Sequence, residues 1–229
     1  MKLDVLQLRI AEFARKLESR DGNAHAYKYS ILDNFRAHWT FDTDNFGAMY
    51  DNALQSEITR RWWKRPNYRP KEVMLILIAQ EEQYVREGFK ELFNESKLTE
   101  NRVDRFVFYS EELLRMFKKA NPLSVENNHY QDSTIISLYL AAMYPDRYTL
   151  YPGHDLFNRA LAALGARSTG TKDDLPRFFK LTHVIYTYLT KNTSITKLIN
   201  NGLRPSGHLL LVHEFLFFTA GAWGETTPG

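Results

Sequence analysis

The stretch Glu126–Phe157, ENNHYQDSTIISLYLAAMYPDRYTLYPGHDLF, decides the fold. Its middle, Thr134–Met143, is almost entirely apolar, which predicts a helix buried on nearly all sides. Polar and aromatic residues crowd both ends of this helix. Because buried polar groups need partners, we expect those before it mainly to secure the helix entry, with ligand binding as the second interpretation. These residues are Asn127, Asn128, His129 and Tyr130.

Apolar residues elsewhere recur at steps of three and four, the period of an amphipathic helix. One helix is expected to begin at Pro70, because proline fits the first helical position. A short helical turn up to about Trp63, followed by a loop, is expected before it, and a separate helix over 82–94 is expected after it. The same pattern predicts further helices over 3–19, 25–38, 46–54, 100–119, 155–164, 175–189, 194–200 and 206–219. No strand-type alternation persists, so the chain is predicted to be all-α with roughly ten helices.

The predicted organisation is one compact helical domain over residues 1–220. A second interpretation has two helical lobes that meet near residues 121–126. The last residues, 221–229, read GAWGETTPG and resemble a linker, because they are rich in glycine and threonine and end on Pro-Gly. At 229 residues the chain is long enough for a substantial core without disulfides or metals.

Composition excludes several classes of protein. The chain has no cysteine, which rules out disulfides and thiolate zinc sites and fits a reducing compartment. The first residues mix charges with leucines, so they do not form a secretory signal peptide. No run approaches the roughly 18 apolar residues of a membrane span. We therefore predict a cytoplasmic protein that does not interact with membranes.

No catalytic, cofactor or metal motif stands out. Gly165–Lys172, GARSTGTK, is close to a phosphate-binding loop, but Thr171 and Lys172 are transposed relative to the GxxxxGK[ST] pattern. It is better read as a turn between helices. The seven histidines lack metal-binding spacing, and His213 and Glu214 adjoin rather than share a helix face. We expect no enzymatic activity, cofactor or metal in this chain alone.

The best binding candidate is a basic and aromatic run. It places six cations between positions 60 and 71 without an acidic residue, although the net charge of the chain is only +3. Cations neutralise phosphates and aromatic rings stack on bases, so the run suits nucleic acid. The alternative is a solvated face or a contact for acidic helices, with Trp62 or Trp63 in the core. The candidate site residues are Arg60, Arg61, Trp62, Lys64, Arg65, Tyr68, Arg69 and Lys71.

Several short segments together resemble the N-terminal regions of AAA-type ATPases from McrB-like, modification-dependent restriction systems. The clearest is Glu126–Asp132, ENNHYQD, followed by ISLYL at 136–140, YPDRY at 144–148 and Tyr151. Other pieces are Trp63 with YRPKEVM at 68–74, ELFNES at 91–96, DRFVFY at 104–109, RFFKL at 177–181 and LLLVHEF at 209–215. The resemblance covers roughly residues 25–217.

The resemblance implies a bacterial phage-defence role. Such proteins place a variable N-terminal domain before a GTP-hydrolysing AAA motor, which forms a hexamer and recruits a nuclease subunit. The N-terminal domain of characterised members recognises modified or specific DNA. This chain would then be a DNA-recognition module for double-stranded DNA, methylated or not, with the motor downstream. The alternative is a helical interaction module that couples the motor to a partner without binding DNA.

Overall fold

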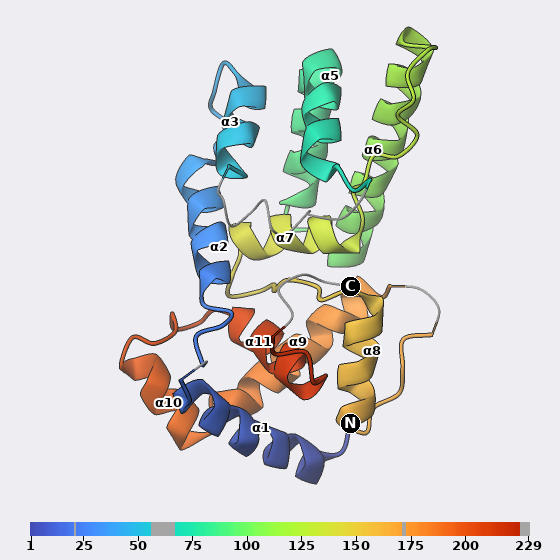
Figure 1. The fold of residues 1–229 in the computed structure, drawn as a ribbon. Helices are drawn as coiled ribbons and strands as arrows, with labels where there is room; N and C mark the ends of the chain where they lie inside the picture. The colour runs from blue at the N-terminus through green and yellow to red at the C-terminus, as the bar shows by residue number, and fades with distance from the viewer. Residues whose placement is uncertain (21, 56–66, 171–172, 225–229) are drawn as a thin grey trace. The chain divides into compact units, whose positions relative to one another are not determined.

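The computed structural model describes residues 1–20, 22–55, 67–170 and 173–224, and these residues form ten α-helices and no strand (Figure 1). The predicted all-α class is therefore confirmed. None of the described helices is both long and apolar enough to cross a lipid bilayer. The helices are α1 (Leu3–Glu18), α2 (Tyr27–His38), α3 (Phe46–Ala53), α5 (Pro70–Leu92), α6 (Thr99–Ala120), α7 (Ser133–Met143), α8 (His154–Ala163), α9 (Leu175–Leu189), α10 (Thr193–Asn200) and α11 (Leu210–Thr219).

The chain divides into two compact units. Unit 1 is built from Met1–Ser30 together with Tyr144–Gly229, and unit 2 is the continuous segment Ile31–Met143. The chain leaves unit 1 within α2 and returns directly after α7. The boundary expected near residues 121–126 falls inside unit 2 instead, where these residues connect α6 to the segment that precedes α7.

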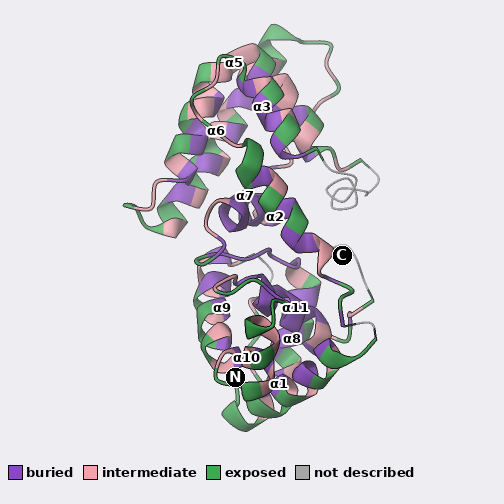
Figure 2. Cartoon of the chain, turned by 90° about the vertical axis from the view of Figure 1, so that its left-hand side faces the viewer, coloured by how far each residue is buried: buried purple, intermediate pink, exposed green. Residues whose placement is uncertain are grey.

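Helix α7 forms the centre of unit 2, as its composition predicts. Every residue from Thr134 to Ala142 is buried, so the helix is apolar and covered on all sides (Figure 2). The carboxylate of Asp132 accepts hydrogen bonds from the backbone N–H groups of Thr134 and Ile135, at 3.0 and 3.1 Å. These bonds satisfy two of the four N–H groups that a helix start leaves unpaired, and a cap of this kind stabilises a helix by about 1 kcal/mol.

The rest of the unit 2 core is aromatic. The ring of Phe89 in α5 lies 5.1 Å from Tyr139 in α7 and 5.0 Å from Phe106 in α6. On its other side Phe89 meets Trp39, which follows α2 and stacks on Phe35. Edge-to-face and tilted pairs of this kind contribute about 0.5–1.5 kcal/mol each beyond their burial. The aromatic residues thus join α2, α5, α6 and α7 into one core.

Helix α5 begins at Pro70 as predicted, but it is not one regular helix. Glu81 has φ −140° and ψ 58°, so two helical segments meet there at a kink, close to the start of the separate helix expected over 82–94. Just after the kink, the guanidinium of Arg86 donates to the carbonyls of Phe41 and Thr43, at 2.6 and 3.1 Å. The second segment is therefore tied to the loop between α2 and α3.

Helix α11 occupies the core of unit 1, where it packs against α1, α8 and α9. Its residues from Leu210 to Phe217 are all buried. The helix was expected to start at position 206, but it starts at Leu210. Gly207 has φ +81° and donates its N–H to the Tyr186 hydroxyl, while the N–H of Leu209 bonds to the Pro145 carbonyl, so the preceding residues are committed elsewhere.

The beginning of the predicted linker belongs to the unit 1 core. Ala222 is buried, and its N–H donates to the Phe217 carbonyl at 2.8 Å. The Trp223 ring meets Phe13 and His25 edge-on, with ring centres 5.9 and 4.6 Å apart. Ala222 and the half-buried Trp223 therefore pack on unit 1, which the linker prediction did not anticipate. Residues 225–229 lie outside the described part of the chain.

Candidate functional site

The described part of the basic run is tied to acidic residues of unit 2. The Tyr68 hydroxyl donates to both carboxylate oxygens of Asp132, at 3.0 and 2.9 Å. Arg69 forms ion pairs with Glu126 and Glu72. The side chains of Tyr68 and Arg69 therefore fix the end of the run against the segment that leads into α7.

Lys71 makes a similar contact two residues further on, in the first turn of α5. Its amine lies 2.8 Å from the carboxylate of Asp51 and 2.9 Å from the backbone carbonyl of the same residue. The other members of the predicted site lie outside the described residues, namely Arg60, Arg61, Trp62, Lys64 and Arg65. Of the eight predicted side chains, the structure thus brings Tyr68, Arg69 and Lys71 to one part of unit 2, each with an acidic partner.

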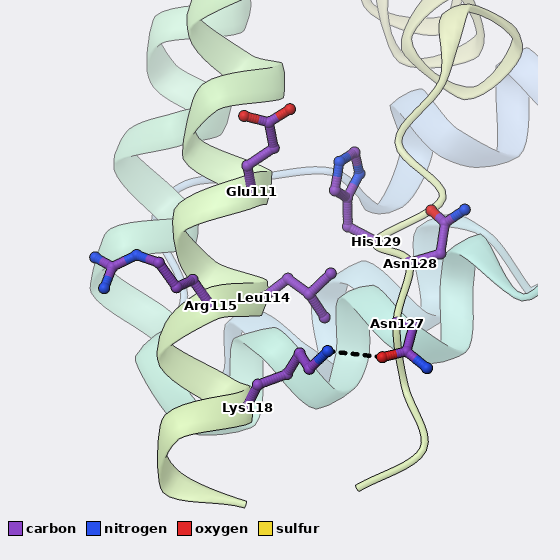
Figure 3. Close-up of a pocket in the computed structure, with 7 residues that line it drawn as sticks. All are labelled: Glu111, Leu114, Arg115, Lys118, Asn127, Asn128 and His129. Carbon is purple, nitrogen blue, oxygen red and sulfur yellow. Dashed lines mark hydrogen bonds between the residues drawn. The ribbon is translucent and has the colours of Figure 1, made fainter. Parts of the chain in front are cut away.

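Unit 2 has a groove of about 530 Å³. It is lined in part by Asn127, Asn128 and His129, which lie in sequence between Glu126 and Asp132, the acidic partners of Arg69 and Tyr68. One wall is α6, and the other is the extended segment before α7 (Figure 3). Leu114 supplies an apolar surface between the two walls, whereas the remaining side chains are polar or charged. The lining residues are Glu111, Leu114, Arg115, Lys118, Asn127, Asn128 and His129.

Hydrogen bonds set the orientation of the groove side chains. Lys118 donates to the Asn127 side-chain carbonyl at 2.6 Å, and the Asn127 amide donates to the backbone carbonyl of Val125 at 3.0 Å (Figure 3). The Asn128 side-chain oxygen accepts the N–H of Tyr130 at 2.6 Å. This last bond holds Tyr130 at φ +57°, a conformation that non-glycine residues rarely adopt. The segment therefore presents its amides in one defined arrangement.

The geometry also fixes the tautomer of His129. The backbone N–H of Gln131 donates to Nδ1 at 3.0 Å, so the proton of the neutral ring is on Nε2. Burial lowers the pKa of His129, while the carboxylates of Glu111 and Asp132 act in the opposite direction. His129 is thus a neutral hydrogen-bond donor at neutral pH, on the wall that faces Glu111 (Figure 3).

A buried hydrogen-bond chain connects this segment to the core. The Tyr50 and Tyr139 hydroxyls are 2.7 Å apart, and the Tyr139 hydroxyl donates to the Gln131 side-chain oxygen at 3.0 Å. The Gln131 amide in turn donates to the carbonyls of Pro70 and His129. All three side chains are buried. The helix entry is therefore secured by Gln131 and Asp132, in addition to the bonds that the Asn127, Asn128 and His129 side chains make within the segment, as the sequence suggested.

The groove is suited to recognition by hydrogen bonds and charge. It combines two cationic side chains, one carboxylate, two amides and a neutral imidazole. The described residues hold no cluster of histidine and carboxylate side chains that could bind a metal ion. None of the groove residues is a serine, threonine or cysteine, so the lining offers no hydroxyl or thiol nucleophile for a base to activate.

The segment that resembles a phosphate-binding loop connects α8 to α9. The guanidinium of Arg177 in α9 donates to the backbone carbonyls of Arg167 and Ser168, at 2.6 and 2.8 Å. Asp174 caps α9 through the N–H of Arg177. Thr171 and Lys172 lie outside the described residues. The described residues fit a turn between helices. A phosphate-binding loop points its backbone N–H groups at the ligand, whereas here backbone carbonyl oxygens point at the Arg177 guanidinium.

A second polar cluster, inside unit 1, was not predicted. Arg204 and Glu214 form an ion pair at 2.9 Å, although their side chains are only 1% and 0% exposed. Lys28 lies beside them, with its amine 2.8 Å from Nε2 of His213. The available signal was a histidine and a glutamate in an otherwise apolar helix, because buried polar groups of this kind need partners.

Comparisons with known proteins add no relative to this description. No protein-family model matches the chain, and neither the curated proteins nor the solved structures include a similar one.

Proposed function

We propose that the chain is a DNA-recognition module of a McrB-like restriction ATPase, and that unit 2 carries the DNA-contacting face. The proposal rests on the resemblance of the sequence segments and on one structural observation. Tyr68 and Arg69 fix the end of the basic run to the same segment that lines the groove. The described end of the basic run and the polar side chains of the groove are therefore attached to the same segment of unit 2.

The ion pairs narrow the list of phosphate contacts. Arg69 and Lys71 have carboxylate partners in unit 2, so these two cations are already partly neutralised. Under the proposal, Arg60, Arg61, Lys64 and Arg65 make the main phosphate contacts, with Lys118 added from the groove. Phosphate contacts give affinity, whereas polar groups that reach base edges give specificity. Asn128 and His129 are the side chains we assign to that second role.

Fluorescence anisotropy with labelled duplex DNA, unmodified and methylated, tests the proposal. Alanine at Arg60, Arg61, Lys64 and Arg65 is expected to abolish binding at low salt. The matched control replaces four exposed cations of unit 1, Arg20, Arg167, Lys180 and Lys197, so that the net charge falls equally. An equal loss of DNA affinity in both variants would mean that the net charge of the chain, and not the basic run, determines binding. Failure of the unaltered chain to bind any duplex at low salt would refute the proposal.

A second candidate function is a protein-interaction module that couples the motor to a partner without DNA. It is favoured by Leu123 and Val125, which are 98% and 84% exposed on the loop between α6 and the groove segment. Two large aliphatic side chains so close together are typical of a contact surface. Replacing both with serine is expected to abolish co-elution of the chain with its AAA motor or nuclease subunit in gel filtration. A complete absence of self-association and of complex formation would exclude this function.

A further inference from the structure

The first turn of α2 is joined to α11 by two basic side chains in direct contact. Lys28 is fully buried in unit 1, and its amine lies 2.8 Å from Nε2 of His213. On the other side of the His213 ring, Nδ1 lies 2.8 Å from the carbonyl of Leu150. Since a carbonyl only accepts, Nδ1 carries a proton, and Nε2 accepts from the Lys28 amine. The Lys28 amine also lies 4.0 Å from the centre of the Phe217 ring.

The surroundings of this pair are charged but balanced. From the loop before α11, Arg204 pairs with Glu214 of α11, and its guanidinium also donates to the Gly22 carbonyl and the Asn23 side chain. Tyr29 of α2 lies beside the same ion pair, with the guanidinium carbon of Arg204 5.8 Å from the centre of its ring. The nearby His25 faces the Trp223 carbonyl through Nε2, at 2.9 Å. One cation and one anion therefore compensate each other before Lys28 or either histidine takes up a proton.

Any further proton in this cluster adds a net charge. A proton on the Lys28 amine can still be accommodated, because the ammonium donates to His213, faces the Phe217 ring and is attracted by Glu214. A proton on Nε2 of His213 is different, because Nε2 then becomes a donor that points at the amine. Two positive charges 2.8 Å apart in a buried site have no solvent to screen them.

We propose that the Lys28–His213 pair is a proton-controlled latch, which holds the first turn of α2 on α11 most tightly while both groups are neutral and loosens as the pair takes up positive charge, first on Lys28 and then on Nε2 of His213. The latch makes the stability of unit 1, but not of unit 2, depend on pH. The device belongs to the fold of unit 1 and is independent of DNA binding.

The pKa values of the two groups agree with this geometry. Burial lowers the pKa of Lys28 to about 7, although Glu214 opposes the change. Burial and the neighbouring Lys28 lower the pKa of His213 well below its usual range. A lysine in the unfolded chain keeps a pKa of about 10.4. Between about pH 7 and pH 10 the unfolded chain therefore binds more protons than the folded one, so stability rises with pH.

The other titratable groups of the cluster differ from Lys28 in the sign or in the pH range of their effect. Burial raises the pKa of Glu214, so above its unfolded pKa of about 4.3 stability decreases as pH rises, which is opposite to the effect of Lys28. Burial also raises the pKa of Tyr29 well above its usual value, and this affects stability only above about pH 10. Burial lowers the pKa of His25 to about 3, so it contributes below pH 6.5. Between pH 7 and pH 9.5, Lys28 dominates.

Urea unfolding of the whole chain, followed by NMR at the methyl groups of Leu211 and Val212 in α11, reads unit 1 alone. The unfolding constant of the unaltered chain is expected to fall by up to tenfold per pH unit between pH 7 and pH 9.5. In Lys28→Met it is expected to stay constant. The control Lys197→Met, an identical change at an exposed position of α10, should retain the full dependence. Equal slopes in all three proteins would overturn the proposal.

A measurement on the unaltered chain covers the case in which Lys28→Met does not fold. With ¹³C-labelled lysine, the Lys28 side-chain resonance is expected to titrate near pH 7, well below the pKa of about 10.4 of a lysine in an unfolded chain. A Lys28 resonance that titrates together with the exposed lysines would show that its proton is not suppressed by burial, and the latch would be refuted.

Discussion

The Tyr68 hydroxyl donates to both oxygens of the Asp132 carboxylate, which also caps α7 through the N–H groups of Thr134 and Ile135. One carboxylate thus joins the end of the basic run to the start of the central helix of unit 2. A change at Asp132 is therefore expected to affect both the stability of unit 2 and the position of the run.

Asp132→Ala is expected to destabilise unit 2 by about 1–2 kcal/mol, because it removes a helix cap and the acceptor of Tyr68. Urea unfolding observed at Ile135 measures this. Tyr68→Phe should cost less, because α7 keeps its cap. The control Asp104→Ala, at an exposed position within α6, should stay within about 0.5 kcal/mol of the unaltered chain. A cost for Asp132→Ala no larger than the control would contradict the assignment.

Tyr139→Phe is expected to cost about 1–3 kcal/mol, because it leaves the Tyr50 hydroxyl and the Gln131 side-chain oxygen without their partner in the buried chain. Adding Tyr50→Phe removes one of the two stranded groups. The double variant should therefore be less destabilised than the sum of the single variants. Strict additivity in a double-mutant cycle would mean that the two hydroxyls act independently.

Arg204→Met is expected to cost about 3–5 kcal/mol, because it leaves the Glu214 carboxylate buried without its cation. Adding Glu214→Leu should restore a large part of the loss. The comparison is the exposed pair Arg36–Asp33 of α2, where Arg36→Met is expected to cost at most about 1 kcal/mol. Similar costs at the two sites would argue that water reaches the Arg204–Glu214 pair.

Lys118→Ala is expected to weaken DNA binding and to reduce the slope of log affinity against log salt by about 0.9, the value for one phosphate contact. Anisotropy titrations at several salt concentrations give this slope. Lys90→Ala removes the same charge from α5, outside the groove, and should leave the slope unchanged. An unchanged slope in Lys118→Ala would show that the groove does not contact DNA phosphates through Lys118. The basic run would then remain the candidate DNA-binding site.

His25 predicts a loss of unit 1 stability in acid. Because burial lowers its folded pKa to about 3, the unfolded chain binds more protons than the folded chain below pH 6.5. Stability therefore decreases as the pH is lowered. The contribution of His25 should raise the unfolding constant by up to tenfold for each unit by which the pH is lowered. His25→Phe is expected to reduce that dependence, whereas His38→Phe, at an exposed position, is not. A pH profile that His25→Phe leaves unaltered would assign the acid sensitivity to other groups.

The helices were predictable because their signals are local. The apolar composition of Thr134–Met143 and the position of Pro70 identify α7 and the start of α5 from a few neighbouring residues. The division into units was not predictable in this way, because the chain passes from unit 1 to unit 2 within α2, where the helical pattern is uninterrupted. The start of α11 was missed because its preceding residues bond to Tyr186 and Pro145, which are distant in sequence.

The candidate site shows the same limit. The basic run is visible as composition, but its anchor depends on Asp132 and Glu126, roughly sixty positions away. The buried cluster of unit 1 is more extreme, because Lys28 and His213 are separated by 185 positions. The periodicity of apolar residues does not indicate contacts between residues that are so far apart in sequence. A histidine and a glutamate within an apolar helix indicate that partners exist, but they do not identify them.

The two-part composition of unit 1 has a consequence for the order in which the chain folds. Unit 2 is a continuous segment and can collect all its core residues as soon as Met143 has been synthesised. Unit 1 cannot, because Lys28 and His25 belong to its first segment, whereas their partners His213 and Trp223 belong to its second segment, which is synthesised after unit 2. Closing such a loop costs less entropy when the intervening segment is already compact. Early folding of unit 2 would therefore accelerate the folding of unit 1.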